Sequence, residues 1–303
     1  MTVAFERIAI IGLGLIGSSV ARVVRKHGLA EHISVCARSP ETRQAAMDLG
    51  LADTVFADPE KAVADADFVL LCTPLGTYKK LAKGFASSLK PGAIVSDVGS
   101  VKESAIRDIG PFMPESVAFV PGHPVAGTEN SGPYSGFAEL FKGRWTILTP
   151  PDGTDPKAVE AVTDFWVRAG SMVEIMDAAH HDLVLAITSH LPHLIAYNIV
   201  GTADDLETVT ESEVIKFAAG GFRDFTRIAA SDPVMWRDVF LGNRDAVLEM
   251  LGRFNEDLSA LQKAIRYKDG DALEALFTRT RYIRREVIEA GQADPDEAPA
   301  DAD

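Results

Sequence analysis

A glycine-rich turn near the amino terminus constrains the fold of this 303-residue chain more than any other feature. The turn, Gly12–Gly17 (GLGLIG), follows the apolar run Arg7–Ile11 and opens Leu15–His27, where apolar residues recur with helical spacing. In a strand–turn–helix context the glycines of a G-x-G-x-x-G pattern allow a tight turn, close approach of the backbone to a pyrophosphate, and helix–strand packing. The sequence therefore predicts a dinucleotide-binding domain. The residues expected to contact the cofactor here are Gly12, Gly14, Leu15, Ile16 and Gly17.

Apolar runs alternate with helical patterns over about 175 residues. Further strands are expected at Ile33–Ala37, Phe68–Cys72, Ala93–Ser96, Val117–Val120, Thr146–Leu148 and Met172–Ile175, and helices at Pro40–Leu49, Leu75–Leu89 and Asp155–Ala169. The runs are continuously apolar, which is typical of strands that helices cover on both faces. The pattern predicts an α/β fold of the Rossmann type, a doubly wound and mostly parallel sheet.

After Asp177 the strand pattern ends and helical patterns follow. Leu183–Val200 is apolar on nearly every side, which predicts a buried helix. Apolar residues at heptad-like spacing then predict one long helix, and a second apolar stripe predicts another helix after it. The first stripe consists of Val247, Leu251, Phe254, Leu258, Leu261 and Ile265, and the second of Leu273, Leu276, Phe277, Ile283 and Val287. The stripes fit either a seam inside one bundle or a subunit interface. We expect a sheet domain over 1–177, a helical domain over 178–291, and a disordered acidic tail over 292–303.

The composition excludes several classes of protein. With 30 Lys and Arg against 44 Asp and Glu, the net charge of −14 argues against a general binder of nucleic acid or of anionic membranes. No secretory signal is visible, and no apolar run reaches the roughly 18–20 residues that span a bilayer. Cys36 and Cys72 lie inside apolar runs, which indicates thiols in a reducing cytoplasm. The chain has no HExxH motif and no cysteine cluster, so we expect no metal site.

The end of the second strand bears on which nicotinamide cofactor binds. NAD-preferring sites usually have an acidic residue there to hold the ribose 2′-hydroxyl, but this chain has Arg38 followed by Ser39. The pair could bind a 2′-phosphate, which favours NADP or dual use; an arginine that stacks on adenine and tolerates NAD remains the alternative. Thr73, Pro74 and Ser100 follow other strand ends and are expected to line the nicotinamide ribose site.

One histidine stands out as a candidate for chemistry. His123 lies in PGHPVAGT, flanked by glycine and proline at a predicted strand end, where core packing does not require it. His190 and His193 lie three residues apart on a mostly apolar helix. A single histidine on such a helix is more often a hydrogen-bonded residue of the core than a functional group.

Five motifs in order resemble the prephenate/arogenate (cyclohexadienyl) dehydrogenase family of tyrosine biosynthesis. They are GLGLIGSS (12–19), DVGSVK (97–102), GHPVAGTENSG (122–132), SHLPH (189–193) and GGFRDFTRIAASDPVMWRD (220–238). The resemblance runs from about Ile8 to Val287. It implies a Rossmann-type domain, a helical domain that forms a homodimer and resembles that of 6-phosphogluconate dehydrogenase, and oxidative decarboxylation of a cyclohexadienol.

The resemblance also implies roles for individual residues. His123 matches the residue that accepts the substrate hydroxyl proton, and Ser100 matches the serine that hydrogen-bonds and orients that histidine. Arg227 matches an arginine that pairs with a substrate carboxylate, with Arg223 and Arg237 as nearby alternatives. The positions assigned to substrate binding are Arg227, His193, Asp224 and Thr128; Asp224 is expected to hold Arg227. His193 further implies tyrosine inhibition at the active site.

Three other functions compete with prephenate oxidation to 4-hydroxyphenylpyruvate and CO₂. Arogenate differs from prephenate only by an amine in place of the side-chain keto group, and the sequence does not separate an arogenate or dual-substrate enzyme from a prephenate enzyme. β-Hydroxyacid dehydrogenases share the two-domain plan but use a lysine on the first long helix of the second domain, and Ala186–Val200 has none. A redox sensor that binds NAD(P) without turnover predicts a degraded catalytic set, whereas His123, Ser100 and Arg227 are all present.

Overall fold

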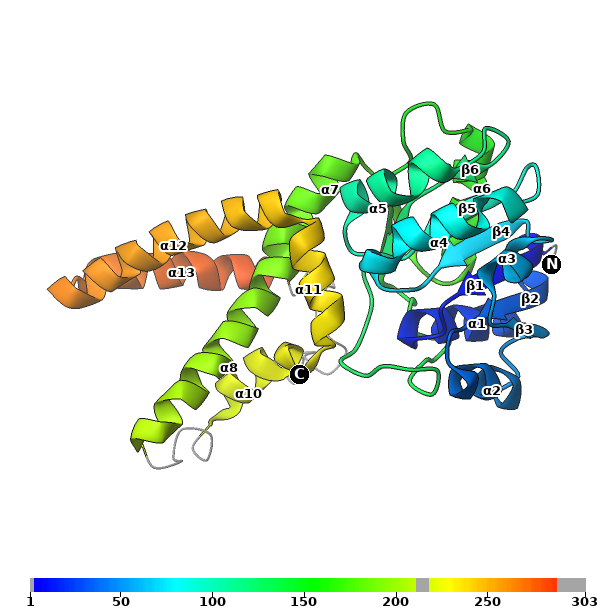
Figure 1. The fold of residues 1–303 in the computed structure, drawn as a ribbon. Helices are drawn as coiled ribbons and strands as arrows, with labels where there is room; N and C mark the ends of the chain where they lie inside the picture. Colours follow the sequence, from blue (N-terminus) through cyan, green and yellow to red (C-terminus); the bar gives the residue numbers. More distant parts are fainter. Residues whose placement is uncertain (1–2, 211–217, 288–303) are drawn as a thin grey trace, which may run out of the picture. The chain divides into compact units, whose positions relative to one another are not determined.

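A six-stranded parallel sheet forms the first part of the molecule (Figure 1). The structure is a computed structural model, and it describes residues 3–210 and 218–287. The strand order is β3-β2-β1-β4-β5-β6, and every neighbouring pair is parallel. The strands are β1 (Phe5–Ile11), β2 (Ala30–Cys36), β3 (Thr54–Phe56), β4 (Phe68–Leu71), β5 (Ile94–Asp97) and β6 (Ala118–Phe119). The predicted Rossmann-type sheet is confirmed.

Helices cover both faces of this sheet. The helices and short 3-10 turns are α1 (Leu15–His27), α2 (Pro40–Asp48), α3 (Pro59–Val63), η1 (Leu75–Thr77), α4 (Tyr78–Phe85), η2 (Ala86–Ser88), α5 (Lys102–Ile109), η3 (Gly110–Phe112) and α6 (Pro156–Arg168). Side chains of α1, α2 and α6 share one apolar cluster with the sheet, and those of α3, α4 and α5 share the cluster on the other face. This two-sided burial explains why the strands are apolar at consecutive positions.

A second, three-stranded sheet was not predicted. It has the order β7-β8-β9 and consists of β7 (Gly122–Pro124), β8 (Trp145–Leu148) and β9 (Met172–Ile175). β7 pairs antiparallel with β8, and β8 pairs parallel with β9. The sequence placed β8 and β9 in the main sheet, which was wrong, because they pair with each other and with β7. β7 itself was not expected, since it is only three residues long and carries no apolar run.

One continuous helical segment follows, made of α7 (Ala178–Leu185), a π-helical turn η4 (Ala186–His190) and α8 (Leu191–Thr210). The prediction that Leu183–Val200 is buried was wrong, because Leu183, Ile187 and Ile199 are 39–47% exposed. Contrary to the sequence reading, Ala178–Leu206 is long and apolar enough to cross a bilayer by length and composition. It also carries three fully buried polar side chains, His181, Asp182 and His190, which fits a helix of a folded domain better than a span.

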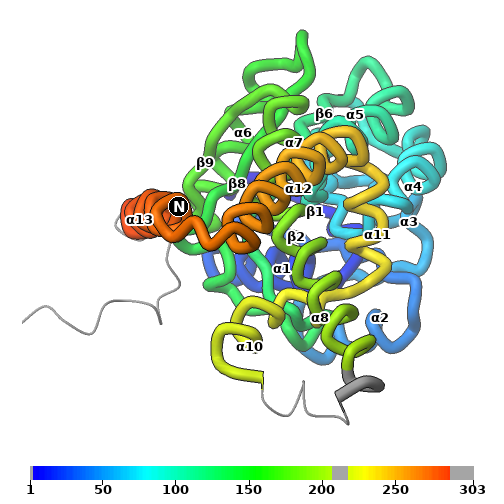
Figure 2. The backbone as a smooth tube through the Cα atoms, turned by 90° about the vertical axis from the view of Figure 1, so that its left-hand side faces the viewer, coloured from blue at the N-terminus to red at the C-terminus, as the bar shows by residue number. Residues whose placement is uncertain are grey.

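Three shorter helical elements come next: α10 (Gly220–Thr226), the 3-10 turn η5 (Arg227–Ala230) and α11 (Pro233–Gly242). α8 lies beside α10 and η5, as Figure 2 shows from the side. Trp236 and Val239 of α11 join the apolar cluster formed by α3, α4 and α5. These contacts make residues up to Val247 one compact unit.

The second compact unit begins at Leu248. It contains most of α12 (Arg244–Tyr267) and all of α13 (Gly270–Val287), which bear out the two long helices predicted from the stripes. Several stripe residues are exposed in the single chain, among them Leu258 (45%), Ile265 (64%) and Phe277 (56%). The expected acidic tail at 292–303 lies outside the described residues.

Candidate active site

The backbone of the glycine-rich turn lies very close to neighbouring main chain. Gly12 adopts a φ of +99°, and a Cβ added to it would lie 2.7 Å from the Cys72 carbonyl oxygen. A Cβ on Gly17 would lie 2.2 Å from the Gly12 oxygen, so both positions need glycine. A Cβ on Gly14 would meet nothing within 4 Å, and α1 starts there with no side-chain cap and no acidic residue in its first turn. The helix therefore offers uncapped N–H groups and its positive end to an anion.

The turn after β2 is positively charged. Arg38 is exposed, and Arg43 Nη1 donates to the carbonyl oxygens of Ala37 (2.8 Å) and Arg38 (2.7 Å). The Ser39 hydroxyl accepts the Thr42 N–H and donates to the Thr42 hydroxyl, so it serves as the N-cap of α2. A ligand phosphate would have to compete with that cap for Ser39, which the sequence did not indicate.

Other predicted cofactor contacts follow the carboxyl ends of β4 and β5, where open parallel sheets bind their ligands. Thr73 and Ser100 are partly exposed, and Pro74 is exposed. The Thr73 hydroxyl accepts a hydrogen bond from Thr77 at 2.8 Å, which fixes the first turn after β4. These residues lie at the same edge of the sheet as the glycine-rich turn.

His123 lies inside β7, opposite Ile147 of β8, and not past a strand end as expected. Its ring is almost fully buried, and its Nδ1 lies 2.8 Å from Nε2 of His181 on α7. Burial lowers the pKa of His123 well below its usual range, and His181, Lys102 and His190 lower it further. The imidazole is therefore neutral at physiological pH and has a free lone pair. The hydrogen bond expected from Ser100 is supplied by His181 instead.

A buried ion pair lies directly behind His123. Lys102 and Asp97 are both 0% exposed, and Lys102 Nζ donates to Asp97 Oδ2 (2.6 Å) and to the Gly122 carbonyl oxygen (2.5 Å). Asp97 also accepts the N–H groups of Gly99 (2.8 Å) and Gly122 (3.2 Å). The pair thus fixes both the loop after β5 and the residue that precedes His123.

His190 ends the π-helical turn and His193 lies in the first turn of α8, and the two rings have different surroundings. His190 is fully buried, and its Nδ1 accepts a hydrogen bond from the Asn243 amide at 3.0 Å. Burial lowers its pKa to about 4. His193 is half-buried, stacks on Trp236 at 3.7 Å between ring centroids, and donates from Nδ1 to the Ser189 carbonyl oxygen. The Arg227 charge is close enough to lower the pKa of His193, although burial is the larger cause.

Arg227 does not pair with Asp224, which the sequence suggested as its partner. Its guanidinium lies 3.2 Å from Glu129 Oε2, so the loop after β7 contacts η5 across the site. Arg227 is 55% exposed at its side chain, and Asp224, Arg223 and the nearby Thr128 are exposed as well. Arg237 pairs with Asp238. Charge effects on the histidine pKa values thus link His123 to His190, His190 to His193, and His193 to Arg227 in succession.

Sequence reasoning missed five residues around these side chains: His181, Asp182, Glu129, Lys102 and Trp236. Glu129, Lys102 and Trp236 stand inside motifs that the sequence analysis quoted, but their partners are distant in sequence. His181 and Asp182 belong to a His-His-Asp run whose polarity inside an apolar helix is the one available signal.

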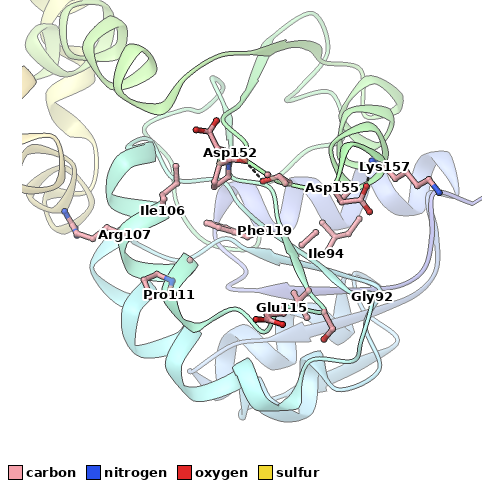
Figure 3. A pocket seen from close by; sticks show the side chains of 18 residues that line it. Gly92, Ile94, Ile106, Arg107, Pro111, Glu115, Phe119, Asp152, Asp155 and Lys157 are labelled. Atoms are coloured by element: carbon pink, nitrogen blue, oxygen red, sulfur yellow. Dashed lines mark hydrogen bonds between the residues drawn. The ribbon is translucent and has the colours of Figure 1, made fainter.

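One hollow of the described surface lies away from these residues. It measures about 860 Å³ and is lined by Gly92, Ile94 and Ser116 at the amino-terminal side of β5 and β6, and by Asp155 and Lys157 at the start of α6 (Figure 3). His123, Ser100 and Arg227 do not line it. Ligands of open parallel sheets bind at the opposite, carboxyl ends. Within residues 3–210 and 218–287, no group of three or more His, Cys, Asp or Glu side chains could hold a metal ion.

Two family models match the chain in succession. Residues 20–175 match the nucleotide-binding domain of prephenate dehydrogenase, and residues 177–279 match the dimerization domain of prephenate dehydrogenase.

Individual relatives agree with these matches. A cyclohexadienyl dehydrogenase of Zymomonas mobilis is 44% identical over 284 residues, which cover 94% of this chain and 96% of the relative. A prephenate dehydrogenase of Bacillus subtilis is 34% identical over 92% of this chain and 74% of its own. The crystal structure of prephenate dehydrogenase from A. aeolicus, in complex with hydroxyphenyl propionate and NAD+, superposes with a TM-score of 0.88 at 35% identity, covering 95% of this chain and all of that one.

Proposed function

The chain belongs to the prephenate dehydrogenase family, and on this premise we propose that it converts prephenate to 4-hydroxyphenylpyruvate and CO₂ in L-tyrosine biosynthesis. It is an NAD(P)-dependent dehydrogenase. When bound, the dinucleotide accepts the hydride that leaves C4 of the substrate ring. The glycine-rich turn and the uncapped start of α1 fit its pyrophosphate.

The state of His123 is the observation that carries the proposal. A buried, neutral imidazole with one nitrogen engaged by His181 keeps its other nitrogen, Nε2, available as a base. His123 Nε2 accepts the proton of the C4 hydroxyl as hydride leaves that carbon. Loss of the ring carboxylate as CO₂ then makes the ring aromatic. Ser100, which follows β5, keeps its assignment as a residue that orients the histidine near the nicotinamide.

Positive charge on the helical side binds the substrate carboxylates. Arg227 is assigned to one carboxylate, because a planar guanidinium forms paired hydrogen bonds with that group. Its present partner Glu129 is an exposed carboxylate, which a substrate carboxylate can replace. Burial and then the Arg227 charge lower the pKa of His193, which supports its assignment to the substrate side chain. Thr128 and Asp224 are assigned to the same site.

Cofactor choice depends on the turn after β2. Arg38 and Arg43 provide two guanidinium groups where NAD-specific sites have a carboxylate, which supports use of NADP as well as NAD. The alternative substrate is arogenate, and the 44% identity to a cyclohexadienyl dehydrogenase supports an enzyme that takes both substrates.

We assign residues 1–177 to dinucleotide binding and 178–291 to substrate binding and dimerisation. The two family models, which meet between residues 175 and 177, support that division. The exposed apolar residues of α12 and α13 support a homodimer. The net charge of −14 supports a protein without nucleic-acid or anionic-membrane partners. Free thiols at Cys36 and Cys72 fit a cytoplasmic enzyme. We further propose that tyrosine inhibits the enzyme at the active site, through His193.

The test is a spectrophotometric assay of NADH and NADPH formation with prephenate and arogenate side by side. We expect turnover of prephenate by the wild type, and a loss on the order of 10²–10⁴-fold in kcat for His123→Asn, with dinucleotide affinity retained. Absence of turnover of either substrate by the folded wild type would overturn the proposed function. An unchanged kcat in His123→Asn would remove His123 from its role.

A further inference from the structure

A chain of three buried side chains leads away from His123. His123 Nδ1 lies 2.8 Å from His181 Nε2, and His181 Nδ1 lies 2.8 Å from Asp182 Oδ1. The two rings are nearly perpendicular, at 70°, with centroids 5.1 Å apart. The three residues are 7%, 0% and 1% exposed, so water does not compete for these hydrogen bonds.

The Asp182 carboxylate is held by two N–H groups in addition to the His181 ring. Its Oδ1 accepts the Lys102 N–H at 2.7 Å, and its Oδ2 accepts the Glu103 N–H at 2.9 Å. Both donors belong to the first turn of α5, where the N-cap residue Val101 makes no side-chain hydrogen bond. Asp182 therefore caps α5 from another helix, which fixes the carboxylate at the positive end of the α5 dipole.

This arrangement determines where the ring protons lie. A carboxylate accepts hydrogen bonds, so His181 donates from Nδ1 to Asp182. A neutral His181 then has its lone pair on Nε2 and accepts from His123. His123 must therefore carry its proton on Nδ1, which leaves Nε2 as the basic nitrogen.

From this geometry we infer that Asp182 and His181 are positioning residues that hold His123 in its Nδ1-protonated form, with Nε2 free for the substrate. The inference rests on the proposed function of His123. In the step itself the O–H bond of the substrate breaks, and its proton forms a new bond to His123 Nε2. The electron pair of the O–H bond becomes the new C–O bond as hydride leaves C4. The resulting imidazolium donates from Nδ1 to His181, and the Asp182 carboxylate balances the positive charge.

The charges around His123 make this balance necessary. Lys102 from α5, His181 from α7 and His190 from the π-helical turn all disfavour a positive charge on its ring. Asp97 offsets Lys102, with which it is paired. Asp182 is the carboxylate that reaches the His123 ring through hydrogen bonds, by way of His181.

A pair of variants at one position tests the inference. His181→Gln keeps a side-chain oxygen that can accept from His123 Nδ1, whereas His181→Leu has a similar volume and no acceptor. We expect His181→Leu to lose on the order of 10²–10³-fold in kcat, within the range for a misplaced general base, and His181→Gln to stay within about tenfold of the wild type.

The pH profile separates positioning from structural damage. The acid limb of kcat/KM should move to lower pH in His181→Leu, because the imidazolium loses its acceptor, and should stay in place in His181→Gln. If both variants lose the same factor in kcat and the acid limb of kcat/KM does not move, the inference is overturned. Prephenate turnover by the wild type would still support the proposed function in that case.

A measurement on the wild type keeps the inference testable if His181→Leu does not fold. Nitrogen-15 NMR of the imidazole rings near pH 8, with His123→Asn to assign the signal, reports the tautomer directly. We expect His123 to be protonated on Nδ1. Protonation on Nε2 would overturn the inference.

Discussion

Burial of the His190 ring should lower the free energy of unfolding measurably at acidic pH. The ring is fully buried and hydrogen-bonded by Asn243, and burial lowers its pKa to about 4 from 6.5. Since the folded state binds this proton less tightly than the unfolded state, the ring contributes its full stability above pH 6.5, and this contribution is lost as the pH falls toward 4. At pH 5 protonation favours the unfolded state about 30-fold, which is about 2 kcal/mol.

The comparison that isolates this effect is between the wild type and His190→Asn. The asparagine side-chain oxygen can accept from Asn243 as the ring nitrogen does, but it does not titrate. Urea unfolding of both proteins near pH 8 and pH 5, at one protein concentration, gives the two free energies of unfolding. The wild type should lose about 2 kcal/mol more than His190→Asn between these pH values. Equal losses in the two proteins would refute the assignment of a buried, neutral His190.

Two further predictions concern charges near the site. Lys102→Met should cost about 3–5 kcal/mol of the free energy of unfolding, because it leaves Asp97 buried without its partner, and adding Asp97→Asn should recover more than half. Urea unfolding measures both, and a loss below about 1 kcal/mol in Lys102→Met would contradict the prediction. Arg227→Ala should raise the KM for prephenate about 10- to 100-fold with a smaller change in kcat, as expected for the loss of a charge-assisted hydrogen bond. Glu129→Gln, which frees Arg227, is the matched control and should not raise the KM; equal values for the two variants would contradict the role of Arg227.

The elements that the sequence predicted well are those with a local cause. The bounds of α1 are those expected, because Gly14 opens the helix and Gly28, at a φ of +60°, ends it. The central strands follow from apolar runs that the two helical layers bury. The strands β3 and β7 were missed because each has only three residues, too few to show a period of two.

The site was predictable only in part, for a related reason. His123 and Arg227 were found through motifs, whereas their partners follow from tertiary packing. His181 is 58 residues from His123, and Glu129 is 98 residues from Arg227. The partner of Arg227 shows how far spacing along the chain can predict a contact. Asp224 precedes Arg227 by three residues, which is a plausible spacing for an ion pair on a helix. The carboxylate that pairs with Arg227 is instead Glu129, from the loop after β7.

The π-helical turn explains how one helical segment places His190 in the core and His193 against Trp236. Pro192 has no N–H, and its ring would clash with the carbonyl four residues earlier in a regular helix, at Thr188. The helix widens at Ala186–His190, directly before this proline, and such widened turns often lie at functional sites. His190 points into the core toward Asn243, while His193 stacks on Trp236 near Arg227. The proline thus changes the helical register where the helix passes from the buried histidine network, which contacts the proposed base His123, to the exposed charges that we propose for substrate binding.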